Sequence, residues 1–125
     1  MSIQYERDDA RRRVKVTVQG TFEKSDMLAI IERQRAEDTW AFGLFVDMRL
    51  MTGRPTIEDL REVMGQATSQ RRGEGRRGPV AILAIDPVLY SVACSYAALG
   101  RSKLTIEVFR DWNEADHWLV EHASS

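Results

Sequence analysis

The sequence feature that most constrains the fold is a pair of short apolar runs without alternation of polar and apolar residues. The runs cover residues 42–48 and 80–85, and a helical pattern follows each of them. A strand of this composition is covered on both faces, as in a parallel sheet. Because strands that alternate with helices connect through right-handed crossovers, the two runs predict a layered α/β domain.

The N-terminal part shows a different pattern. Residues 14–18 alternate valines with polar residues, which predicts a half-exposed strand. A turn signal at residues 7–10 separates this strand from a shorter alternating stretch at residues 3–5. We therefore expect an antiparallel hairpin ahead of the parallel units.

Three helix starts are marked by capping residues. Thr56 follows a proline and precedes Asp59 by three residues, which resembles a capping box. Asp86 is followed by Pro87, and proline favours the first helical position. Asp111 opens a further capping-box pattern near the C-terminus.

These elements together predict an α/β fold with a mixed sheet of about five strands and four helices. An antiparallel hairpin comes first, and parallel β-α units follow it. The 125 residues are expected to form one domain, residues 1–125, because this length is typical of a domain. Gly100 is expected to end the third helix.

Composition excludes several classes of protein. The net charge is -1, so no overall field attracts nucleic acid, and no nucleic-acid partner is expected. The single Cys94 cannot form an internal disulfide. The N-terminus lacks the apolar region of a secretory signal, and no apolar run reaches the ~18 residues of a membrane span. We therefore expect a cytoplasmic protein that does not span a membrane.

The chain resembles the SpoIIAA-like family of small STAS-type domains, especially its stand-alone bacterial members of unknown function. The resemblance is carried by the segments "VTVQGTF", "LFVDMR", "PTIEDL", "AILAIDPVLYSVACSYA" and "IEVFRDWNEADHWL". It implies a mixed sheet with four helices. It also implies relatives that work as anti-sigma-factor antagonists, as regulatory domains or, in a distant branch, as binders of lipophilic ligands.

The candidate site follows the first buried run, since sites of open α/β sheets lie outside the carboxyl ends of the strands. In phosphorylatable SpoIIAA-like proteins a serine-containing motif at this junction supplies the phosphoacceptor. The segment "MTGRPTIE" has no serine, so Thr56 is the possible phosphoacceptor, and Arg54 is placed to help hold a phosphate. The ordinary interpretation is a capped turn. The candidate ligand or partner surface consists of Asp47, Arg49, Met51, Thr52, Arg54, Thr56, Asp86 and Tyr90.

Two classes of function follow from these residues. The first is a non-catalytic regulatory or binding domain for a protein partner or a small apolar ligand, because no catalytic constellation is evident in the sequence. The alternative is a small enzyme with Asp47 as acid or base, Arg49 or Arg54 as an anion clamp and Tyr90 as proton donor.

The remaining candidates carry weaker signals. The arginine-rich segment 71–77 is interpreted as a solvated loop, with phosphate binding as the alternative. His117 and His122 are five residues apart, which is not the spacing of a helical metal pair, so no metal and no cofactor is expected. A partly exposed tryptophan fits a possible homodimer interface. The residues expected to form either ordinary core or an apolar pocket are Met48, Met51, Met64, Tyr90, Cys94 and Tyr96.

Overall fold

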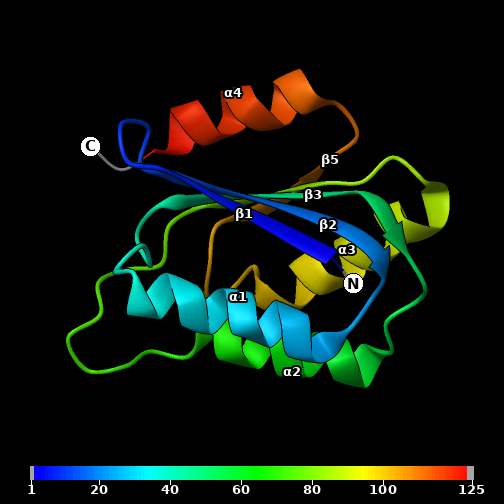
Figure 1. The fold of residues 1–125 in the computed structure, drawn as a ribbon, viewed down its shortest axis with the longest axis horizontal. Helices are drawn as coiled ribbons and strands as arrows, with labels where there is room; N and C mark the ends of the chain where they lie inside the picture. The colour runs from blue at the N-terminus through cyan, green and yellow to red at the C-terminus, as the bar shows by residue number, and fades with distance from the viewer. Residues whose placement is uncertain (1, 124–125) are drawn as a thin grey trace.

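The computed structural model describes residues 2–123 of the chain. It contains five strands and four helices in the predicted order (Figure 1). The strands are β1 (Ser2–Asp8), β2 (Arg13–Thr21), β3 (Gly43–Thr52), β4 (Val80–Leu83) and β5 (Ile106–Phe109). The helices are α1 (Lys24–Ala36), α2 (Ile57–Thr68), α3 (Pro87–Gly100) and α4 (Trp112–His122).

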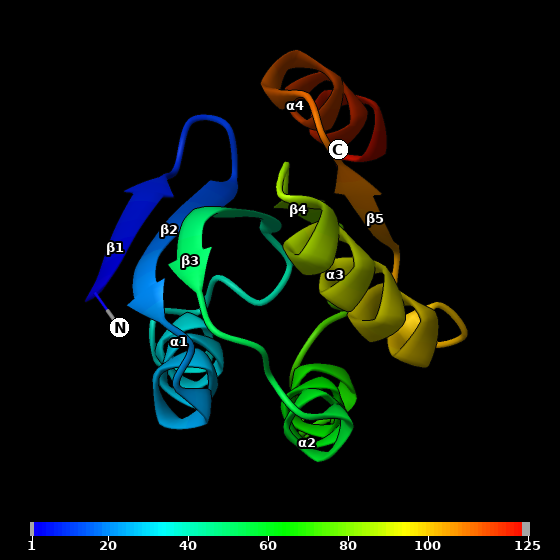
Figure 2. The same cartoon turned by 90° about the vertical axis from the view of Figure 1, so that its right-hand side faces the viewer.

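The strands form a single mixed sheet in the order β1-β2-β3-β4-β5. β1 pairs with β2 in antiparallel orientation, and the other three pairs are parallel. Successive right-handed crossovers in this order place α1, α2 and α3 on one face of the sheet. α4 follows the last strand and covers the other face, as Figure 2 shows. The predicted α/β fold is therefore confirmed.

The sheet separates two apolar clusters. The larger one lies between the sheet and helices α1 to α3, and it includes the fully buried Val14, Val16 and Val18 of β2. The smaller one lies under α4, where Phe45 of β3 contacts Leu119 and its neighbours. Because β3 is buried on both faces, its sequence shows no alternation.

Three helices begin at the predicted caps. The Thr56 hydroxyl accepts a hydrogen bond from the backbone N–H of Asp59 at 3.1 Å. Asp86 caps α3, and Asp111 caps α4. Each cap satisfies backbone N–H groups that a helix N-terminus leaves without an intrahelical partner.

A bulge interrupts the pairing of β2 with β3. Thr17 is opposite Asp47 and Gln19 is opposite Leu50, so one extra residue lies on β3. Beyond such an extra residue, the side chains of the strand point to the opposite faces from those that strict alternation would give them. Met48 and Met51 both stay in the larger cluster, whereas the two residues between them are exposed.

Gly100 does not end α3 by adopting a left-handed conformation. It is the last helical residue, and Arg101 continues in right-handed geometry. A Cβ atom at Gly100 would collide with the sulfur of Met64 in α2. The glycine therefore leaves room for the end of the Met64 side chain between α2 and α3, a contact that the local sequence did not indicate.

Candidate functional site

The predicted surface residues lie near one edge of the sheet, where the parallel strands end and the helices begin. We call this the carboxyl edge. Thr52 ends β3, and Thr56 and Asp86 precede α2 and α3. Sites in open α/β folds are found at this edge.

Asp47 and Arg49 of β3 form a tight pair. One carboxylate oxygen of Asp47 accepts hydrogen bonds from Nε and the backbone N–H of Arg49 at 3.0 and 3.1 Å. The other oxygen accepts from Nη2 at 2.9 Å. The Asp47 side chain is 7% exposed, whereas that of Arg49 is 42% exposed. The pair thus connects a buried carboxylate to a guanidinium that reaches solvent.

The surroundings keep Asp47 ionised. Burial alone raises the pKa of this carboxyl, but the hydrogen bonds from Arg49 and the positive charges of Arg49 and Lys15 outweigh it. The pKa of Asp47 is therefore below its ordinary value. A general acid or base at neutral pH needs a pKa close to neutrality, and this shift goes in the opposite direction.

Tyr90 does not approach Asp47 from the same side. It packs against the larger cluster beneath α3, and the guanidinium carbon of Arg110 lies 4.0 Å from its ring centre. Asp47 follows Phe45 by two residues in β3, so both side chains point to the face of the sheet that α4 covers. On that face the guanidinium carbon of Arg49 lies 5.2 Å from the ring centre of Trp112. The acid/base pair of the enzymatic hypothesis is therefore divided between the two faces of the sheet.

The other predicted residues have structural roles in the turn. The Thr52 hydroxyl is 3.4 Å from that of Thr21, and its carbonyl accepts from the backbone N–H of Phe22 at 3.0 Å. Asp86 accepts from the first two N–H groups of α3 that follow Pro87. Met51 is 4% exposed and belongs to the core, so it does not contribute to the surface. Arg54 is exposed.

Sequence reasoning missed an apolar feature of the same edge. Four of the five exposed large hydrophobic side chains among residues 2–123 lie there, and we call them the edge patch. Apolar residues close to capping residues were a usable signal, because three of the four adjoin Thr56 or lie within two residues of Asp86. The edge patch consists of Leu50, Ile57, Ile85 and Val88, with exposed fractions of 58%, 46%, 54% and 48%.

A cavity of about 70 Å³ lies between the sheet and helices α1 to α3. Met48, Met51 and Tyr96 line it as the sequence suggested, whereas Met64, Tyr90 and Cys94 are not part of its lining. Among the described residues that line it, Arg77 is the only charged one.

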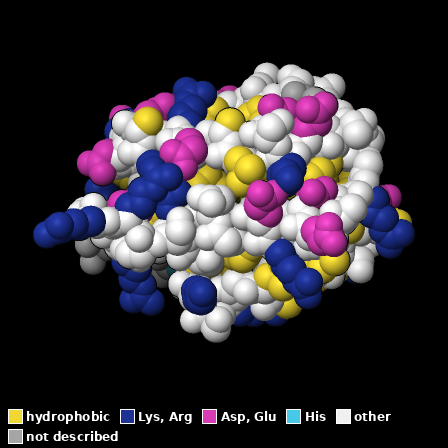
Figure 3. Space-filling model, turned by 90° about the horizontal axis from the view of Figure 1, so that it is seen from below, with side chains coloured by type: hydrophobic (Ala, Val, Ile, Leu, Met, Phe, Trp, Pro, Cys, Tyr) yellow, Lys and Arg dark blue, Asp and Glu magenta, His cyan; other side chains and the backbone are white. Residues whose placement is uncertain are grey.

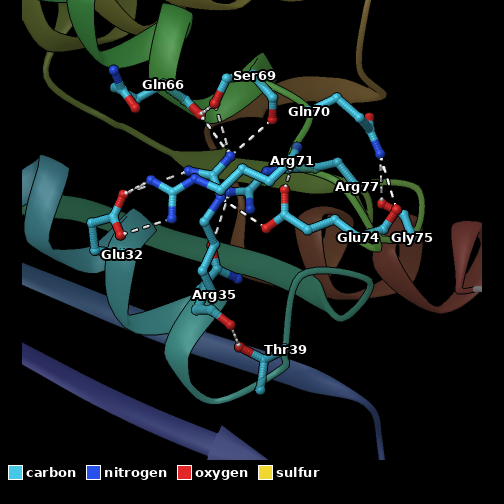
Figure 4. A network of polar contacts seen from close by, with 11 residues as sticks. Glu32, Arg35, Thr39, Gln66, Ser69, Gln70, Arg71, Glu74, Gly75 and Arg77 are labelled. Atoms are coloured by element: carbon cyan, nitrogen blue, oxygen red, sulfur yellow. Dashed lines mark hydrogen bonds and ion pairs between the residues drawn. The ribbon is translucent and has the colours of Figure 1, made fainter.

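Arg77 belongs to a network that joins the arginine-rich loop to α1 (Figure 4). Arg35 of α1 donates to Glu74 at 2.8 Å and to the backbone oxygen of Ser69 at 2.8 Å. Arg71 donates to Glu32 at 2.7 Å. The interpretation of residues 71–77 as a solvated loop is therefore wrong for Arg77, whose guanidinium is buried. Packing against α1, which is distant in sequence, causes this burial.

The remaining candidates have ordinary roles. His117 is within 2.8 Å of Glu121, and His122 contacts the carbonyl oxygen of Trp118 on the same helix. Cys94 is half-buried and packs against the larger cluster. No group of three or more potential metal ligands is found in the described part of the chain. Within residues 2–123, no helix has the length and apolar character needed to cross a membrane.

The surface over α1 and α2 carries both signs of charge. Figure 3 shows basic and acidic side chains interspersed on this face, with small apolar areas between them. The formal net charge is -1. A nucleic-acid interface would instead present a basic stripe or patch.

The geometry defines an SpoIIAA-like fold, and comparison with solved structures shows the same. An anti-sigma factor antagonist from Mycobacterium paratuberculosis superimposes with a TM-score of 0.60 at 13% identity, over 94% of each chain. A protein of the DUF3478 family with a SpoIIAA-like fold from Shewanella loihica superimposes with a TM-score of 0.59 at 13% identity. That match covers 94% of this chain and 92% of the other.

Comparison by sequence gives no further relatives. No protein-family model matches the chain, and no curated protein matches it significantly. At 13% identity the structural likeness establishes the fold and leaves function to the residues of the site.

Proposed function

We propose that this chain is a non-catalytic binding domain that docks a protein partner on its carboxyl edge. The observation that carries the proposal is the edge patch. Contiguous exposed apolar patches commonly mark an interaction site, and all four side chains lie where the parallel strands end. Four such side chains at one edge of a small sheet are well placed for this purpose.

Two further observations support a binding role over catalysis. The Asp47 carboxylate is paired with Arg49 and has a lowered pKa, so it is poorly suited to proton transfer. The structurally similar antagonist from Mycobacterium paratuberculosis counters an anti-sigma factor, which is itself a protein. The same kind of interaction, between this edge and another protein, is proposed for this chain.

Thr56 lies within the same surface. It is exposed, adjoins Ile57 of the edge patch and caps α2. A phosphoryl group on Thr56 would add negative charge beside an apolar contact, which disfavours docking through desolvation. Phosphorylation of Thr56 remains a prediction, and mass spectrometry of protein from its native host tests it.

The experiment uses photo-crosslinking at Val88 to identify partners, followed by titration with the purified partner. Ile85→Glu is expected to weaken binding at least tenfold, since it buries a charge in the apolar contact. Val120→Glu is the matched control. Val120 is 61% exposed, and it lies near the C-terminal end of α4, outside the edge patch.

Equal affinity of wild type and Ile85→Glu for the partner would reject the edge patch as the docking surface. Light scattering on the same samples distinguishes a second copy of the chain from a different protein. Concentration-dependent dimerisation that Ile85→Glu abolishes would identify the partner as the chain itself.

A further inference from the structure

A polar hollow lies at the end of the sheet opposite the carboxyl edge. We call this end the amino edge, because β2, β3 and β4 begin there. The hairpin turn before β2, the loop before β3 and the arginine-rich loop before β4 meet at this edge, at the left in Figure 1. The hollow has a volume of about 400 Å³, and its charged lining residues are Arg12, Arg35, Asp38, Arg72 and Glu74.

Two of these charged residues have a left-handed backbone conformation. Arg12 has a φ of 51° and Asp38 a φ of 58°, and within residues 2–123 they are the only residues other than glycine with a positive φ. Glycine adopts this conformation without strain, whereas other residues adopt it rarely. Strained backbone of this kind is concentrated at ligand-binding sites. That both residues line one hollow calls for a role of their side chains in it.

Two arginines of the lining have charges that no carboxylate neutralises. Arg12 and Arg72 are exposed, and among residues 2–123 neither has a carboxylate within ion-pair distance. Glu74 does not neutralise them, because its carboxylate pairs with Nε of Arg35 at 2.8 Å. The lining therefore presents two cations from two separate segments of the chain, with Asp38 as the remaining acid.

The segments that carry these cations are held in place by other contacts. The guanidinium carbon of Arg12 lies 5.0 Å from the ring centre of the buried Phe42. In the arginine-rich loop, Glu74 accepts hydrogen bonds from the backbone N–H of Arg71 at 2.9 Å and from Arg35 of α1 at 2.8 Å (Figure 4). A site that is ordered before binding loses less conformational entropy when the ligand arrives.

The charges and donors of the hollow match a phosphate group. A guanidinium presents planar N–H donors that bind two oxygens of a phosphate at once. A phosphate monoester carries a charge of about -1.5 to -2 at neutral pH and three acceptor oxygens, so it can engage Arg12 and Arg72 together. Asp38 repels a bare phosphate, but its carboxylate accepts a hydrogen bond from a hydroxyl group on the same ligand.

We propose that the hollow at the amino edge binds a small hydroxylated phosphate monoester. Arg12 and Arg72 hold the phosphate group, and Asp38 accepts a hydrogen bond from a hydroxyl of the ligand. The volume of about 400 Å³ is within the range of about 300–1,000 Å³ that is usual for small-molecule sites. This inference does not depend on the edge patch, which lies at the other end of the sheet.

Titration calorimetry of the full chain with glycerol 3-phosphate, together with thermal unfolding, tests the arginines. Wild type is expected to bind this ester at low salt and to unfold at a higher temperature in its presence. Arg12→Gly and Arg72→Gln are each expected to bind it at least tenfold more weakly, because a charged donor is lost. Glycine suits the left-handed backbone at position 12, so Arg12→Gly is expected to fold.

Arg76→Gln is the matched control for loss of a positive charge. Arg76 is an exposed arginine of the same loop as Arg72, but it does not line the hollow. Arg76→Gln is therefore expected to bind glycerol 3-phosphate like wild type. No binding by folded wild type would overturn the proposal. An equal loss of affinity in Arg76→Gln and Arg72→Gln would also overturn it, because the ligand would then respond only to the overall charge of the loop.

Asp38→Gly tests whether the ligand is a hydroxylated ester or free phosphate. Wild type is expected to bind glycerol 3-phosphate roughly threefold more tightly than inorganic phosphate, because the ester makes one more hydrogen bond. Asp38→Gly relieves the backbone strain and is expected to bind inorganic phosphate at least as tightly as wild type, while its preference for the ester disappears. Equal affinity of wild type for the two ligands, or a preference that Asp38→Gly retains, would overturn the assignment of a hydroxylated ester.

Discussion

Replacement of Asp47 by asparagine tests the energetic role of the Asp47–Arg49 pair. Asparagine keeps a side-chain oxygen that can accept a hydrogen bond from the backbone N–H of Arg49. In the wild-type structure this N–H lies 3.1 Å from the carboxylate oxygen of Asp47. It loses the negative charge that two guanidinium nitrogens contact at 3.0 and 2.9 Å. Breaking a fully buried ion pair costs about 3–5 kcal/mol, because the remaining charge is left without solvent.

The structure indicates a smaller cost for Asp47→Asn. Arg49 is 42% exposed, so water can solvate its charge after the carboxylate is removed. The expected loss is that of charge-assisted hydrogen bonds, about 1–3 kcal/mol in the free energy of unfolding at pH 7. Urea denaturation of wild type and Asp47→Asn measures this difference.

The pH dependence gives an independent check. The folded-state pKa of Asp47 is lowered, so its contribution is fully present above the unfolded pKa of about 3.9. The contribution is lost as pH falls through the folded pKa. The stability difference between the two proteins is therefore expected to be largest near neutral pH and to shrink in acid. A difference that stays constant or grows as pH falls would refute the assignment of a stabilising charge to Asp47.

Three further substitutions test the fold, each by urea denaturation. Thr56→Ala is expected to cost about 1 kcal/mol through loss of the α2 cap, and Thr56→Ser should restore most of it; equal stability of the two variants would contradict the cap. Gly78→Ala is expected to cost roughly 2 kcal/mol or more, because its Cβ would collide with the carbonyl oxygens of residues 41–42. Gly75→Ala meets open space and should be close to neutral, so similar losses in both would refute the steric argument. Phe45→Ala is expected to cost about 3–5 kcal/mol, because this ring is 1% exposed beneath α4; a loss below 1 kcal/mol would show that α4 contributes little.

The elements of the fold were predictable because their signals are local. Thr56, Asp86 and Asp111 each cap a helix through a backbone group two or three residues away. The valines of β2 alternate because one face of that strand is buried. Such contacts are formed within a few residues, so the sequence reports them directly.

The candidate site was predictable in part. Its position at the carboxyl edge follows from strand order, and Asp47 does pair with Arg49. The edge patch was missed, because Leu50 and Ile85 resemble the ends of buried strands until the bulge and the shortness of β4 are known. The contact of Gly100 with the end of the Met64 side chain was likewise not evident from the local sequence.

The cavity depended entirely on the tertiary structure. The sequence around Arg77 is polar and rich in glycine, which is typical of a solvated loop. Arg77 is nevertheless buried, because folding brings it against Trp40 and Gln34, which are about forty residues away in the chain. The sequence by itself determined the strands, helices and caps, since these depend on neighbouring residues. The tertiary structure decided which charges are enclosed and which apolar side chains stay exposed, since those depend on contacts between distant segments.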